Sequence, residues 1–151
     1  MRRAILALLS LPLLYAAGDT GERVRYKGGT VSGVTAGTAA RIIVMEDDAL
    51  EFNPAKKQTI RIPWKDITTL EYGMRVSRRY MEAVLISPVF LAAKRRQHYL
   101  TIGYTDSDSR PQAMVLEVGK ESIRPMLVSL ETKSGKKIEY QDEEARKAGR
   151  G

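Results

Sequence analysis

The chain has 151 residues, no cysteine, and 25 Lys and Arg against 18 Asp and Glu, which gives a formal net charge of +7. This length predicts a single domain, and the lack of cysteine excludes disulfide bonds and thiolate metal sites. The excess of positive charge favours an acidic partner or an anionic surface and says nothing about the fold.

Residues 1–18 are typical of a secretory signal peptide. Two arginines precede the apolar run 4–17, which at 14 residues is too short for a comfortable transmembrane helix. Ala16 and Gly18 are small residues at the −3 and −1 positions, so we expect cleavage before Asp19. The sequence therefore predicts an exported protein, periplasmic or extracellular, and an uncleaved N-terminal anchor is the alternative.

The expected mature domain, residues 19–140, has mainly the patterns of β-strands. Apolar and polar residues alternate, as at Leu100, Ile102 and Tyr104, which places one face of each strand in a core. Gly28 and its neighbour Gly29 interrupt the first strand and indicate a bulge or bend. Seven strands are expected, near 24–34, 41–46, 49–52, 59–64, 67–73, 98–105 and 112–118.

A helical period follows the strands, with apolar residues at i, i+3, i+4 and i+7: Ile123, Met126, Leu127 and Leu130. Gly135 is suited to end this helix. Pro125 is tolerated if the helix begins near Ser122, whereas a start at Lys120 predicts a kink. Residues 136–140 favour a short further strand, and the charged residues 141–151 are expected to form a disordered tail.

This order of elements resembles the pleckstrin-homology-like superfold, which includes bacterial PH-like and GRAM-type domains. The segment from Ile62 to Gly73, IPWKDITTLEYG, is similar to the strand passage of that group in which a Pro–aromatic pair precedes an Ile and then Leu-x-Tyr. The resemblance covers residues 22–135 and extends to secreted bacterial proteins of this build. It implies a mainly β, α+β fold, in which bent antiparallel sheets form a barrel or sandwich closed by the C-terminal helix.

An apolar insertion at about 75–97 interrupts the β pattern. Its middle, residues 83–93, has no charged side chain, and we expect residues 76–93 to be largely helical, with a break or kink near Pro88. As a helix this middle would be about 17 Å long, too short to cross a hydrocarbon layer of about 30 Å. Burying its six large apolar side chains is favourable by on the order of 10 kcal/mol before entropy costs, so we expect them to leave water.

Three destinations stay open for this insertion: a membrane surface, a protein partner or second copy, and the chain's own barrel. In the first case the flanking basic residues would lie at the lipid headgroups. The residues expected to contact a membrane or partner are Arg75, Arg78, Arg79, Leu85, Ile86, Val89, Phe90, Leu91, Lys94, Arg95 and Arg96.

The sequence offers no catalytic residues, cofactor site or metal site. His98 is the only histidine, and the sequence has no recognisable nucleophile motif for which it could act as a general base. It is therefore interpreted as a strand-start residue. Asp106 and Asp108 lack the later ligands of a calcium loop and predict a hairpin tip. The resemblance implies no inositol-phosphate site, because the first hairpin loop, Gly33 to Ala40, contains no Lys or Arg. A nucleic-acid ligand is disfavoured, because the chain has few aromatic residues on which bases could stack and because it is expected to be exported.

The sequence therefore predicts an exported, non-enzymatic binding or adaptor module that contacts an anionic membrane surface or an envelope protein through its insertion. The alternative is a soluble periplasmic module that binds peptides or associates with itself, with the insertion packed in its own core. A homo-oligomer is compatible with either function.

Overall fold

A computed structural model describes residues 21–44, 47–75 and 97–150. Its elements are β1 (Glu22–Gly29), β2 (Ala39–Ile43), β3 (Ala49–Pro54), β4 (Ile60–Pro63), the short 3-10 helix η1 (Trp64–Asp66), β5 (Ile67–Gly73), β6 (His98–Thr105), β7 (Pro111–Val118), α3 (Lys120–Ser134), β8 (Ile138–Tyr140) and α4 (Glu143–Arg150). The expected signal segment lies outside the described residues, as does the insertion between Arg75 and Gln97.

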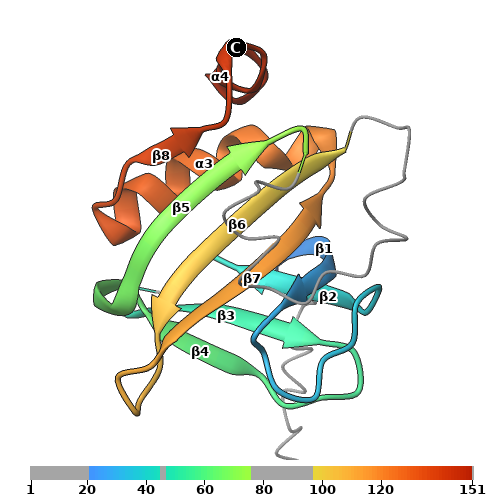
Figure 1. Ribbon diagram of the computed structural model, residues 1–151, viewed down its shortest axis with the longest axis vertical. Helices are drawn as coiled ribbons and strands as arrows, with labels where there is room; N and C mark the ends of the chain where they lie inside the picture. The colour runs from blue at the N-terminus through green and yellow to red at the C-terminus, as the bar shows by residue number, and fades with distance from the viewer. Residues whose placement is uncertain (1–20, 45–46, 76–96, 151) are drawn as a thin grey trace, which may run out of the picture.

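The expectation of a mainly β fold is confirmed. Eight strands form one sheet in the order β4-β3-β2-β1-β7-β6-β5-β8. The neighbouring strands are antiparallel, except that β8 lies parallel to β5. The separate antiparallel sheets that the resemblance implies are thus joined into one, because β1 pairs with both β2 and β7. Figure 1 shows β5, β6 and β7 running diagonally above β2, β3 and β4, which cross the view.

The bulge expected in the first strand is present. The register between β1 and β7 shifts between Tyr26 and Gly28, and Gly28 and Gly29 have φ values of 157° and 149°. Such positive φ values favour glycine. A Cβ atom at Gly29 would also collide with the carbonyl oxygen of Ala113. The two glycines therefore allow β1 to bend while β7 stays close to it.

One face of the sheet and one face of α3 share a single hydrophobic core. Leu100 and Ile102 of β6 are fully buried, and so are Leu50 and Phe52 of β3. The helical face predicted from the sequence joins the same cluster: Ile123, Met126, Leu127 and Leu130. The two periodicities of the sequence, two for strands and 3.6 for the helix, therefore identify these core residues correctly.

Helix α3 begins at Lys120, the earlier of the two starts considered from the sequence, so Pro125 lies inside it. The proline lacks the N–H that would otherwise bond to the carbonyl of Glu121, so one intrahelical hydrogen bond is missing. The helix ends as predicted at Gly135, which has a left-handed φ of 69° and donates its N–H to the carbonyl of Glu131 at 3.0 Å.

The expectation of a disordered C-terminal tail is wrong, because residues 143–150 form α4. Ala145 and Gly149 are buried one turn apart, so this helix packs closely through two small residues. The carboxylate of Asp142 accepts the N–H of Ala145 at 2.7 Å, and Arg124 of α3 donates to the carbonyl of Ala148 at 2.9 Å. Because most residues of this segment are charged, the sequence pattern does not reveal the buried stripe formed by Ala145 and Gly149.

Candidate ligand-binding groove

An open cavity of about 780 Å³ lies where the outer parts of β1, β2 and β3 meet the end of β7, the start of β6 and the start of α3. This volume is within the range of about 300–1,000 Å³ that is typical of ligand sites. We call it the basic groove. Its described lining is Arg23, Val24, Arg25, Ala39, Ala40, Arg41, Asn53, Ala55, Gln97, His98, Glu117, Val118, Gly119 and Lys120.

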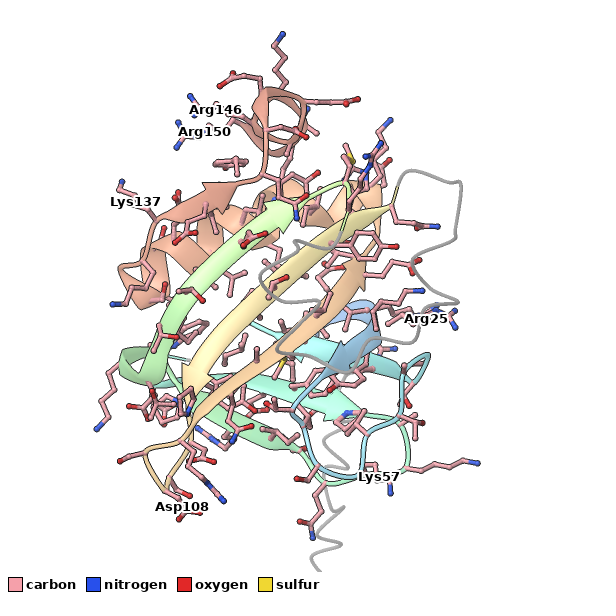
Figure 2. All side chains as sticks on the ribbon, in the orientation of Figure 1. Arg25, Lys57, Asp108, Lys137, Arg146 and Arg150 are labelled. Atoms are coloured by element: carbon pink, nitrogen blue, oxygen red, sulfur yellow. The ribbon has the colours of Figure 1, made fainter. Side chains whose placement is uncertain are left out.

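Strand alternation places the arginines of β1 in this groove. Val24 and Tyr26 point into the core, so Arg23 and Arg25, which alternate with them, point outward and are exposed. Figure 2 shows Arg25 extending away from β1, far from Lys137 beside β8. The local sequence of one strand therefore supplies two of the four cations that line the groove.

The register of the sheet brings a third arginine beside the first. Arg23 and Arg41 are direct cross-strand partners in the β1–β2 pair, and Asn53 of β3 continues the same row. Arg41 donates from Nη1 to the carbonyl oxygen of Gly21 at 3.1 Å. Side chains in such positions are neighbours, and two like charges facing each other destabilise the sheet.

One carboxylate, that of Glu117, lies among the cations of the groove. Glu117 is the direct cross-strand partner of Arg25 and forms an ion pair with Lys27. The side chains of this ion pair are only 11% and 22% exposed, so water screens it less than a surface pair. Among the described lining residues, Glu117 supplies the only carboxylate. The groove as a whole therefore keeps a positive field.

His98 lies at one end of the groove and is held by a core tyrosine. The hydroxyl of Tyr72 lies 2.6 Å from Nδ1 of His98. Burial, and then the nearby phenol of Tyr140, raise the pKa of Tyr72 to about 12, so this hydroxyl keeps its proton near neutral pH. The hydrogen bond fixes the orientation of the imidazole ring and leaves Nε2 for other contacts.

The charge state of His98 follows from the same surroundings. Burial, and then the ammonium group of Lys120, lower the pKa of His98 below its ordinary value. The imidazole is consequently neutral at pH 7. At that pH the positive charge of the groove comes from Arg23, Arg25, Arg41 and Lys120.

The start of α3 adds a partial positive charge at the same end as His98. Gly119 is the N-cap of the helix and offers no side chain to accept the first N–H groups. Gly119 and the exposed Lys120 both line the groove. The dipole of the helix is positive at its N-terminus, so this end of the groove attracts negative charge in addition to the lysine.

The residues that the sequence suggested for membrane or partner contact are almost all outside the described chain. Arg75 is described: it is exposed two residues after the end of β5, and its carbonyl oxygen accepts a hydrogen bond of 2.6 Å from Nε2 of Gln141. Outside the described residues lie Arg78, Arg79, Leu85, Ile86, Val89, Phe90, Leu91, Lys94, Arg95 and Arg96. The structure therefore brings a different set of cations together, from β1, β2 and α3.

Two other sequence interpretations fall on described residues. His98 begins β6, as a strand-start residue should, but it also lines the groove. Asp106 forms the expected hairpin tip, where its Oδ1 accepts the backbone N–H groups of Asp108 and Arg110, each at 2.9 Å. These hydrogen bonds lower the pKa of Asp106. They also commit its carboxylate to stabilising the turn. In the described parts of the chain, no three His, Asp or Glu side chains form a metal-binding group.

Within the same parts, no helix has the length and apolar character to cross a bilayer. No protein-family model, no curated protein and no solved structure matches this chain. The basic groove is therefore the candidate site in the described residues.

Proposed function

We propose that this protein is a non-enzymatic binding module of PH-like fold and that its ligand site is the basic groove. The observation that carries the proposal is an open cavity of about 780 Å³ lined by four cations, Arg23, Arg25, Arg41 and Lys120. Guanidinium groups match the geometry of carboxylate and phosphate groups, to which they donate paired hydrogen bonds. The ligand is therefore anionic.

Two groups that could act as acid or base are committed to other contacts, which supports binding over catalysis. Tyr72 and His98 share a hydrogen bond. Glu117 is held in the ion pair with Lys27. General acid–base catalysis needs a group that exchanges its proton near the working pH.

The PH-like part of the proposal is supported by the strand order. Strands β1 to β4 follow one another as neighbours, as do β7, β6 and β5, and β1 joins the two runs. Helix α3 follows the last strand of this arrangement and contributes to the same core. This is the order of elements that the resemblance implies, and β8 and α4 are additions to it.

NMR titration with inorganic pyrophosphate tests the proposed site. We expect shifts concentrated at the groove cations and at the first residues of α3, which weaken as salt increases. Arg23→Gln should lower the affinity, whereas Lys137→Gln, which removes an exposed cation far from the groove, should leave it nearly unchanged. Shifts spread evenly over all surface cations, with equal effects of the two variants, would show that the groove is not a site.

Membrane contact through the insertion is a second proposal, and the pattern of the sequence supports it: an uncharged run between two basic clusters. Changing Leu85 and Phe90 to Ser should abolish flotation with anionic liposomes and leave the fold intact. Unfolding of this variant, or a wild type that never floats, would instead place the insertion in the core of a soluble peptide-binding or self-associating module.

Export is proposed on the strength of the signal-like residues 1–18. N-terminal sequencing of the protein from its native host should find Asp19 as the first residue. A retained Met1 in the membrane fraction would identify the segment as an anchor instead.

A further inference from the structure

We infer that the basic groove binds a small organic anion whose charged group is attached to a flat aromatic ring. This inference rests on the proposed anion-binding function and names the ligand class for the same site. It follows from two neighbouring rows of side chains on the outer face of β1, β2 and β3. One row is cationic, and the other provides an uncharged surface beside it.

The cationic row gathers its charge around Arg23. Arg23 and Arg41 are direct cross-strand partners on β1 and β2. The pairing of β1 with β7 brings the start of α3, with Lys120, to the other side of Arg23. Arg23 therefore lies between two further cations. A single compact phosphate or carboxylate group at this position is attracted by all three.

The next row on the same face is formed by two alanines. Residues two apart in a strand share a face and are about 7 Å apart. Ala39 lies two residues before Arg41, and Ala55 lies two residues after Asn53, the partner of Arg41. The N–H of Ala55 donates to the carbonyl oxygen of Ala39 at 2.9 Å, so the two alanines are side by side. Both are exposed and line the groove. We call this pair the alanine floor.

The side chain of Arg25 borders the alanine floor. Arg25 is the direct cross-strand partner of Ala39, and its Nη1 donates to the carbonyl oxygen of Gly37 at 3.4 Å. The guanidinium group therefore lies on the β2 side of β1, whereas Glu117 lies on the β7 side. A planar guanidinium group stacks on aromatic rings. A ring on the alanine floor thus has a cationic neighbour that favours it.

The size of the groove also favours a ligand larger than its charged group. The cavity of about 780 Å³ is comparable to the sites of drug-sized molecules. A bare phosphate group would leave most of this space to water. A ring that covers the alanine floor uses the space and removes apolar surface from water. The expected ligand is an aryl phosphate or aryl carboxylate, with its charged group at Arg23.

Isothermal titration of the full chain with phenyl phosphate and methyl phosphate tests this inference, because the two probes share one charged group and differ in the ring. We expect phenyl phosphate to bind about tenfold more tightly. Ala39→Gln covers the alanine floor with a polar side chain and should remove this advantage, and Ala55→Gln should act in the same way. Thr68→Gln should retain it, since it adds the same side chain at an exposed position of β5, which β1, β7 and β6 separate from β2.

The outcomes separate this inference from the function on which it rests. Equal affinity for the two phosphates, or an advantage of phenyl phosphate that survives in both alanine variants, would overturn the ring site while pyrophosphate binding still supported an anion site. Tighter binding of a blocked phosphotyrosine peptide than of phenyl phosphate would assign the ring to a partner protein and overturn a small-molecule ligand. Failure of pyrophosphate and both phosphates to bind would overturn the proposed function as well.

Discussion

The hydroxyl of Tyr72 lies 2.6 Å from Nδ1 of His98, and the two rings are stacked with their planes 8° apart. The pair joins β5 to the first residue of β6, on either side of the insertion. His98 also lines the basic groove. One hydrogen bond thus links the core to the edge of the proposed site.

This pair predicts a pH dependence of stability. Burial lowers the pKa of His98 in the folded protein, so between that pKa and about 6.5 the unfolded chain binds more protons than the folded one. The contribution of His98 is therefore fully present above about pH 6.5 and is lost as the pH falls through the folded pKa. Thermal unfolding from pH 7.5 to 5.5 should show a falling melting temperature, and His98→Gln should flatten that fall. A wild type that grows more stable towards pH 5.5 would contradict the assignment.

Helix α3 offers a test of its docking on the sheet. Leu127 is only 2% exposed, and its neighbour Val128 is 63% exposed. Leu127→Asp places an unpaired charge in the core and should lower the free energy of unfolding by about 3 kcal/mol or more. Val128→Asp introduces the same residue on the outer face and should change it by about 0.5 kcal/mol or less. Equal effects in urea unfolding would show that α3 is not packed as described.

The C-terminal helix α4 is tested at Gly149. A Cβ atom there would lie 2.6 Å from Cε1 of Tyr140 and 3.1 Å from Cδ1 of Leu127, so Gly149→Val should push the helix away. Amide hydrogen exchange should then be faster in α4. The exchange rates in β6 and β7 should stay unchanged, because the packing of these strands does not depend on α4. Lys147→Val, which adds the same side chain at an exposed position, should leave α4 protected. Similar protection in both variants would argue against this packing.

The sequence predicts the strands and α3 well, because the residues of the hydrophobic core recur with the period of the backbone, as at Leu100, Ile102 and Tyr104. The same approach fails for α4, whose buried positions are the small residues Ala145 and Gly149. They give little hydrophobic signal, and their packing depends on distant side chains such as Tyr140. Local pattern cannot detect such a contact.

The basic groove could not be predicted from the sequence either, because it also depends on contacts between distant parts of the chain. Arg23 and Arg25 are visible as outward residues of one strand, but the sequence alone does not give the strand register that sets Arg41 opposite Arg23. Nor does it show that the start of α3 returns to the same place and brings Lys120 with it. The apolar insertion, in contrast, is visible in the sequence because its apolar residues are consecutive.

The facing arginines make opposite predictions for stability and for binding. No described side chain forms an ion pair or hydrogen bond with Arg23, so Arg23→Gln removes repulsion from Arg41 at little other cost. The ligand-free variant should be more stable by roughly 0.2–1 kcal/mol at low salt. The gain should shrink as salt increases, because salt screens the repulsion.

Thermal unfolding of the wild type and Arg23→Gln, each with and without pyrophosphate, tests the central claim most directly. The account predicts that the variant melts higher than the wild type without the ligand and gains less from pyrophosphate, since stabilisation by a ligand follows its affinity. Lys137→Gln should match the wild type in its response to pyrophosphate. An Arg23→Gln variant that melts lower than the wild type and gains as much from pyrophosphate would contradict an anion site built around Arg23 and Arg41.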